Sequence, residues 1–339
     1  MDWGEFYATH SEPLVGESSS GELIFSDRAT GQEVVPRSRG HHTDMLPKSQ
    51  VFWKDQGDVV IEASGWAYKV HQNILSQHSS RLGSMLMHDL RGTASGHSVL
   101  ELEASKEGID LMLRIMYHSL NVNEPISFDQ VEALMHVGNK YEVKLMKDEA
   151  VERMKDAGLV SELAEYKEVN LELQRSIEYQ EGLVFDIINI AVKYRLREVL
   201  PVAFLVACPD YSRGVLESRS GTLSRTARDI WLRGREALDS KKDRPFSWVD
   251  AYSKTHDQCH TVMNNIKKGI QAVPFRLRRL LYKWNDFTEE FGREGADTYL
   301  NIQGLCKECR LACLKHVTKQ RKLTWEELPS DFGLGAWRH

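Results

Sequence analysis

The chain of 339 residues has no long apolar run and few cysteines. Its longest apolar stretch, Val199–Cys208, is much shorter than the ~20 residues that a helix needs to cross a bilayer, so we expect no membrane span. The first residues, MDWGEFYATHSE, carry acid where a secretory signal carries Lys or Arg, so we do not expect export. Five cysteines are a sparse and odd set that fits reduced thiols. These observations predict a soluble intracellular protein, cytoplasmic or nuclear.

The common motifs of catalytic sites are also missing. The sequence has no GxxxxGKS/T phosphate loop, no HExxH helix, no GxSxG nucleophile elbow and no GxGxxG turn after a strand. The segments GESSSG and GTASG lie in expected loops and lack the strand–turn–helix setting that a nucleophile elbow needs. We therefore expect a non-catalytic protein that needs no cofactor.

Acidic residues are absent from Gln258 to Asn285, although the net charge of the whole chain is −5. Between Gln258 and Leu323 there are 13 Lys or Arg residues against 6 Asp or Glu residues. Such a basic segment could attract nucleic acid or an acidic partner. However, Phe275 and Tyr282 recur at helical spacing within it, which favours a packed helix with a solvated basic face. Nucleic-acid binding is therefore the less favoured interpretation.

Regular secondary structure is expected from about residue 51. Asp58–Ala63 is β-branched and apolar, Ser64-Gly65 is a turn dipeptide, and Trp66–Val70 alternates aromatic and polar residues. This pattern predicts a β-hairpin. The elements expected next are a short helix over 71–76, a helix capped by Ser79, a loop over 92–97, a strand over 98–102, a helix capped by Ser105, and two amphipathic helices up to residue 155.

From residue 156 onward the apolar spacing is helical almost throughout. Residues 182–208 predict two packed helices that meet near Pro201, and residues 239–258 read as a polar loop. The closing segment, LTWEELPSDFGLGAW, predicts a turn-rich end anchored by Trp. The segment before residue 51 mixes Gly, Ser, Pro and charge and predicts a loosely ordered tail. The sequence thus predicts a tail over 1–50, an α+β domain over 51–155 and a helical domain over 156–339.

The order of these elements resembles the BTB/POZ domain. The resemblance is carried, in order, by DVVI, GWAYKVHQNILSQHSSRLGSMLM, VLEL, IDLMLRIMYHSL and VEALMHVGNKYEVKLMKDEAV. The later helical segments look like the C-terminal region of a large fungal group of BTB proteins. The resemblance implies a protein-docking domain that pairs as a homodimer through an N-terminal segment and its first helices. In some members such a domain then holds a cullin scaffold or a corepressor.

Asp58, His71 and Leu90 are the candidates for partner binding that the resemblance implies. Asp58 and His71 lie at the edges of elements, where the favoured interpretation is local hydrogen bonding that fixes the hairpin and the helix start. Repressor-type members have a basic residue after the His, whereas this chain has Gln72. Cullin-binding members have a Glu two residues after an apolar residue, whereas Leu90-Arg91-Gly92 lacks it. A cullin-ligase adaptor and a DNA-associated regulator are therefore kept as alternatives to a general interaction module.

Cys306 and Cys309 form a CxxC pair, and Cys313 follows about one helical turn later. Zinc takes four Cys or His ligands, and Cys259 with His256 or His260 could complete such a set from the preceding helices. A single CxxC is weak evidence for metal, and on a helix the three cysteines of this segment share one face, as buried core thiols do. The sequence favours buried thiols over a structural zinc, and a redox site is the least favoured.

Overall fold

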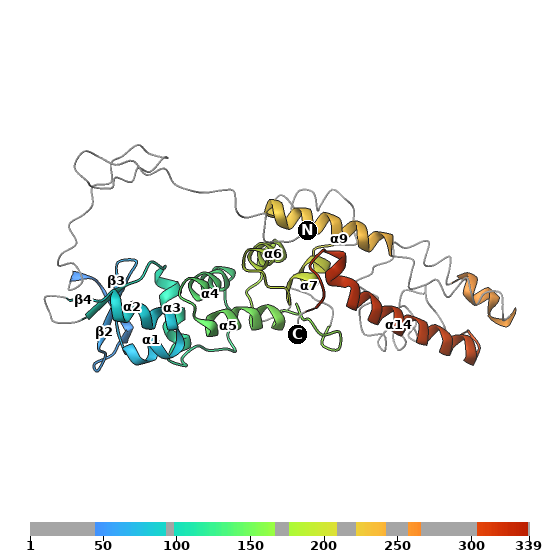
Figure 1. The fold of residues 1–339 in the computed structure, drawn as a ribbon. Helices are drawn as coiled ribbons and strands as arrows, with labels where there is room; N and C mark the ends of the chain where they lie inside the picture. The colour runs from blue at the N-terminus through green and yellow to red at the C-terminus, as the bar shows by residue number, and fades with distance from the viewer. Residues whose placement is uncertain are drawn as a thin grey trace, which may run out of the picture.

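The structure is a computed structural model that describes residues 45–92, 98–166, 176–208, 222–241, 257–265 and 304–337 (Figure 1). Most of the tail expected over 1–50 lies outside these residues. Its last part does not, because the first strand begins at Lys48, inside the segment expected to be loosely ordered. Among the described helices, none combines the length and the apolar character that a bilayer span requires.

Five strands form one sheet in the order β1-β3-β2-β5-β4. Their bounds are Lys48–Trp53 for β1, Val59–Ala63 for β2, Trp66–Val70 for β3, Arg91–Gly92 for β4 and Ser98–Glu101 for β5. β2 and β3 pair antiparallel as the predicted hairpin, whereas β1 pairs with β3 and β5 with β2 in parallel. Ser64 and Gly65 have φ values of 46° and 74°. Positive φ at both turn residues is what a two-residue hairpin turn matched to the strand twist requires.

Side-chain alternation gives the sheet two different faces. The hairpin residues that face the helices are buried in the main core: Val59, Ile61, Ala63, Tyr68 and Val70. On the opposite face, Val60, Ala67 and Val99 form a second and smaller buried cluster. Leu46 and Trp53 pack against that second cluster, so the β1 segment helps to cover the outer face of the sheet.

Five helices follow the hairpin or lie after β5. Their bounds are Gln72–His78 for α1, Ser80–His88 for α2, Lys106–Met116 for α3, Phe128–Lys140 for α4 and Lys144–Asp156 for α5. The predicted caps at Ser79 and Ser105 are confirmed, because each hydroxyl accepts a backbone N–H from the first turn of its helix. Ser127 caps α4 in the same way and forms a capping box with Gln130.

The later part of the described chain is helical. The helix bounds are Leu183–Tyr194 for α6, Leu200–Val206 for α7, Arg225–Ser240 for α9 and Lys307–Asp331 for α14, with a 3-10 turn, η4, over Asp257–Cys259. The prediction of two helices that meet near Pro201 is confirmed, because Pro201 lies in the first turn of α7. The polar loop expected over 239–258 is wrong at both ends, where α9 and η4 are helical. Residues 242–256 lie outside the described ranges.

The turn-rich end expected after residue 322 is also corrected, because α14 continues to Asp331 and contains Pro329. A proline lacks the N–H that would bond to the carbonyl four residues earlier, which here belongs to Trp325. The indole Nε1 of Trp337 donates to that carbonyl instead, at 2.7 Å. The rings of Trp325 and Trp337 also stack, with centroids 5.1 Å apart. The expected anchoring by Trp is thus present, and it lets the helix run through the proline.

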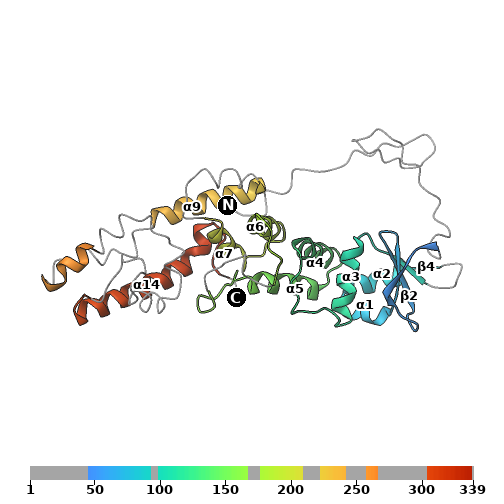
Figure 2. The same cartoon turned by 180° about the vertical axis from the view of Figure 1, so that it is seen from behind.

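The elements are arranged along an elongated molecule (Figures 1 and 2). The sheet and α1–α3 form one end, α4 and α5 lie in the middle, and α9 and α14 form the other end. One continuous core runs from the sheet to Phe332 at the end of α14. The helical part therefore packs directly onto the α4–α5 side of the α+β part.

Candidate protein-interaction surface and thiol cluster

A polar corner holds the start of α1 against the sheet. The carboxylate of Asp58 accepts the backbone N–H of Gln72 at 2.8 Å, which satisfies one of the unpaired donors of the first helical turn. The backbone N–H of His71 donates to the hydroxyl of Tyr117 at 3.0 Å, and the His71 Nδ1 lies 2.8 Å from the same oxygen. Burial raises the pKa of Tyr117; the His71 N–H opposes this shift and the charge of Asp58 adds to it. Asp58 and His71 are thus engaged in contacts that fix the hairpin and the helix start.

Leu90, the third expected partner residue, is half-buried and packs against the main core. The two residues after it form β4, in which Arg91 pairs with Val99 of β5. The guanidinium of Arg91 lies 2.7 Å from the carboxylate of Glu101. The position that carries Glu in cullin-binding members is therefore a strand residue here. Of the loop expected over 92–97, Gly92 belongs to β4 and the rest lies outside the described residues.

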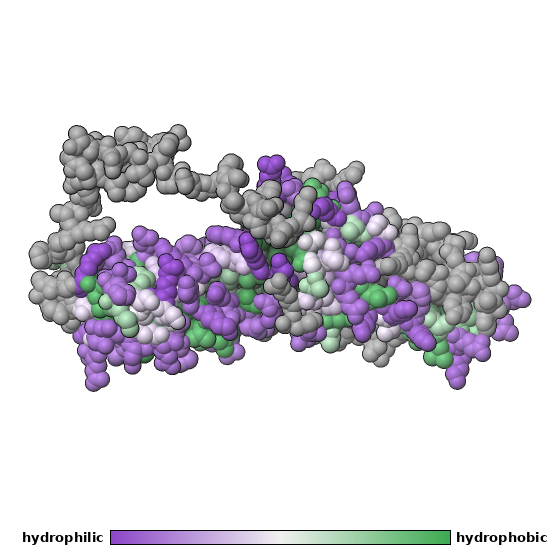
Figure 3. Space-filling model, viewed as in Figure 1, coloured by the Kyte–Doolittle hydropathy of each residue, from purple (hydrophilic) through white to green (hydrophobic). Residues whose placement is uncertain are grey.

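Exposed apolar side chains occur on α2 and at β1. The buried stripe of α2 consists of Leu82 and Leu86, and Met87 points away from it with 82% of its surface exposed. Val51 of β1 and Met45 just before it are also exposed. Figure 3 shows small apolar patches among hydrophilic residues at this end of the molecule. Methionine suits such a surface because its unbranched side chain adapts to many shapes.

The described later helices, α6, α7, α9 and α14, do not cover this end of the molecule. α6 packs against α4, and α14 packs against α7 and α9. The indole Nε1 of Trp325 on α14 donates to the carbonyl of Ser161, which follows α5. Both ribbon views place α1, α2 and the sheet at the far end from α9 and α14 (Figures 1 and 2). A partner can therefore reach the α2 surface without displacing any of these helices.

A hollow of about 370 Å³ lies among α6, α7, α9 and the end of the described chain. Its lining includes Arg195 and Arg197 together with apolar residues such as Val192 and Leu200. None of its lining residues is a carboxylate, a histidine or a cysteine. Thr226 supplies a hydroxyl, but no carboxylate or histidine among these lining residues could activate it as a nucleophile.

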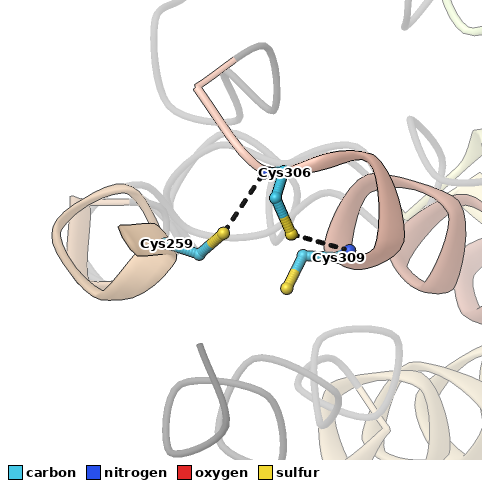
Figure 4. A group of neighbouring side chains, drawn as sticks. All are labelled: Cys259, Cys306 and Cys309. Carbon is cyan, nitrogen blue, oxygen red and sulfur yellow. Dashed lines mark hydrogen bonds between the residues drawn. The ribbon is translucent and has the colours of Figure 1, made fainter. Parts of the chain in front are cut away.

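Three cysteine thiols lie close together at the N-terminal end of α14. The Sγ atoms of Cys259, Cys306 and Cys309 all lie within 4.8 Å of one another (Figure 4). The backbone N–H of Cys306 points at the Sγ of Cys259 at 3.2 Å, and that of Cys309 points at the Sγ of Cys306 at 3.5 Å. The Cys309 N–H lowers the pKa of Cys306, whereas burial raises the pKa of Cys313 to about 12. Of the four cysteines considered from sequence, Cys313 lies outside this cluster.

Comparison with known protein families matches the BTB/POZ domain to residues 49–157. Residues 49–157 form a BTB/POZ domain. The matched segment contains the five strands and α1–α5, and the predicted α+β class is confirmed. BTB/POZ domains are protein-interaction domains. A search of the curated proteins finds no match for this chain. The similarity of the later helices to fungal BTB proteins stays a prediction.

Sequence reasoning missed Met87 as a surface residue. The apolar spacing of Leu82, Met85 and Leu86 predicts the core-facing stripe of this helix and says nothing of the methionine that follows. The signal was present, because successive helical residues are about 100° apart and Met87 falls outside the apolar stripe. A large apolar residue off the stripe of an amphipathic helix is a candidate contact residue.

Proposed function

We propose that this protein is a non-catalytic interaction module that pairs with a second copy of itself through the α2 end of its BTB/POZ domain. Its helical C-terminal part then presents or selects a partner protein. The observation that supports this proposal is the exposure of Met87 at an end of the domain that the described later helices leave open. Self-association through identical surfaces closes with two copies and leaves no unpaired interface.

The contribution of Met87 to such a dimer follows from its burial. Burying one methionine side chain contributes about 1.5–3 kcal/mol, and an isologous dimer buries the residue twice. Replacing Met87 with aspartate removes both contributions and places a carboxylate in the interface. The loss is then about 3–6 kcal/mol, which weakens dimerisation about 10²-fold to 10⁴-fold.

Sedimentation of the full chain over a range of concentrations tests this proposal. The wild-type chain is expected to sediment as a dimer, and Met87→Asp as a monomer at the same concentrations. Val122→Asp is the matched control, because Val122 is 62% exposed and lies between α3 and α4. A monomeric wild-type chain, or a Met87→Asp variant that dimerises as well as Val122→Asp, would contradict the proposal.

Two more specific functions have their own tests. For a cullin-ligase adaptor, a stable complex must form with a cullin N-terminal domain and weaken on Leu90→Ala. For a DNA-associated regulator, the chain must bind mixed-sequence DNA at low salt, where phosphate contacts contribute most. Most of the basic segment behind that second function lies outside the described residues. No contact among the described residues favours either function over the interaction module.

A further inference from the structure

The thiol cluster joins two segments that are distant in the sequence. Cys259 ends the turn η4, whereas Cys306 and Cys309 lie at the N-cap and in the first turn of α14. The hydrogen bond from the Cys306 N–H to the Cys259 Sγ spans 47 residues. Cys259 and Cys309 are buried, and Cys306 is half-buried. Three sulfur atoms from two segments thus surround one point that solvent reaches from the side of Cys306.

Burial and the neighbouring thiols raise the pKa of Cys309 to about 12, so a metal must displace its proton, whereas the other two sulfur atoms each face a backbone N–H donor. Two backbone N–H groups point at two of the three sulfur atoms, and N–H donors stabilise negative charge on their acceptor. The N-terminal end of α14, a helix of 25 residues, adds its positive dipole end. Thiolates are soft ligands that select zinc among the common divalent cations of proteins.

The two segments approach each other closely at Gly304 and Val262. A Cβ atom added at Gly304 would lie 2.8 Å from a methyl group of Val262, so glycine allows this approach without a shift of the Val262 side chain. Met263 and Leu305 are buried beside the cysteines, yet neither belongs to the main core. Among the described residues the apolar area around the cysteines is small, which is a setting in which proteins use a metal as a staple.

We propose that Cys259, Cys306 and Cys309 bind one zinc ion that fastens the η4 segment to the start of α14. The three thiols release their protons to solvent on binding and supply three of the four tetrahedral positions. The ligands come from two segments that are distant in the sequence, so the bound ion holds these segments together. This inference does not depend on self-association of the BTB/POZ domain, and either proposal can fail alone.

Metal analysis of the full chain tests the site. The chain is purified with reductant, exposed to excess zinc and then passed into metal-free buffer. One zinc per chain is expected for the wild type, and almost none for Cys259→Ser or Cys306→Ser. Cys208→Ser and Cys313→Ser are the matched controls and are expected to keep the metal, because both thiols lie outside the cluster.

A second measurement covers the case in which a variant fails to fold. Cobalt added to the metal-free wild-type chain should produce intense tetrahedral absorption bands together with sulfur-to-cobalt charge transfer. Blocking the thiols of the zinc-loaded wild type should release the zinc. The proposal is overturned if the wild type holds no zinc, or if Cys259→Ser retains it. It is also overturned if the three cysteines resist zinc because two of them form a disulfide, which lowers the mass by two hydrogens.

Discussion

Replacement of Arg153 by methionine tests how the BTB/POZ domain is joined to the helical part. The side chain of Arg153 is 3% exposed, and its Nε donates to the carboxylate of Glu149 at 2.7 Å. One terminal nitrogen donates to the carbonyls of Glu124 at 2.6 Å and Ser176 at 3.4 Å, and the other to that of Asn121 at 3.3 Å. The hydroxyl of Ser176 donates back to the carbonyl of Arg153. One guanidinium thus connects α5, the segment before α4 and the segment that leads into α6.

The expected loss of stability follows from the burial of this group. Removing one partner of a buried ion pair costs about 3–5 kcal/mol, because the other charge stays buried without compensation. Glu149 is 20% exposed, so water reaches its carboxylate and the lower end, about 3 kcal/mol, applies. Lys155 on the same helix is the matched control. Its side chain is 29% exposed and its partners Glu152 and Glu198 are 62% and 38% exposed, so water screens these ion pairs and they contribute about 1 kcal/mol.

Urea denaturation of the full chain provides the measurement. Arg153→Met is expected to lower the free energy of unfolding by about 3 kcal/mol, and Lys155→Met by less than about 1 kcal/mol. Methionine keeps most of the side-chain volume, so the difference reports the polar network and not a cavity. Equal effects of the two substitutions would refute the reasoning, because they would show that Arg153 contributes no more than a surface charge.

Two further predictions concern the contact between α9 and α14. A Cβ at Gly234 would lie 1.8 Å from the ring of Phe332, so Gly234→Ala should destabilise the chain by about 2 kcal/mol despite the better helix propensity of alanine. Gly83→Ala, whose nearest neighbour is 3.6 Å away, should stabilise it by up to about 1 kcal/mol, and the reverse ranking in urea would contradict the packing argument. Burial lowers the pKa of Lys241, but hydrogen bonds to carboxylates of α14, Asp331 among them, outweigh burial and raise it above 10.5. The stabilisation from Lys241 is therefore complete below pH 10.5 and is lost as the pH rises through the folded-state pKa of Lys241. The difference in free energy of unfolding between the wild type and Lys241→Met should therefore shrink in strong alkali. A difference that does not change with pH would contradict these ion pairs.

The parts of the fold that depend on neighbouring residues were predictable from the sequence. The hairpin follows from β-branched alternation around Ser64-Gly65, and two helix starts follow from the hydroxyls of Ser79 and Ser105. In each case the residues that decide the structure lie within a few positions of one another. Local propensity and tertiary packing agree there, so the sequence pattern suffices.

The features that depend on distant residues were not predictable. The continuation of α14 through Pro329 needs the indole of Trp337 as a substitute donor to the carbonyl of Trp325. The thiol cluster needs Cys259 to approach Cys306 across 47 residues, and spacing along the chain does not report that approach. Spacing alone also suggested Cys313 as a ligand, because it lies on the same helical face one turn beyond Cys309. Its sulfur nevertheless lies outside the cluster.

Only one side of the BTB/POZ domain contacts the described later helices, and this decides which side is used in the proposed dimer. The α4–α5 side is occupied by the chain's own α6 and by the Arg153 network, which is why the proposed dimer uses the side of α2 and the sheet. An isologous contact there places the two helical parts at opposite ends of the assembly, because each protomer is elongated along the line from its sheet to α14 (Figure 1). The thiol clusters at those ends then lie far from the interface. Self-association and partner selection would therefore use separate surfaces, and a substitution at either one should leave the other intact.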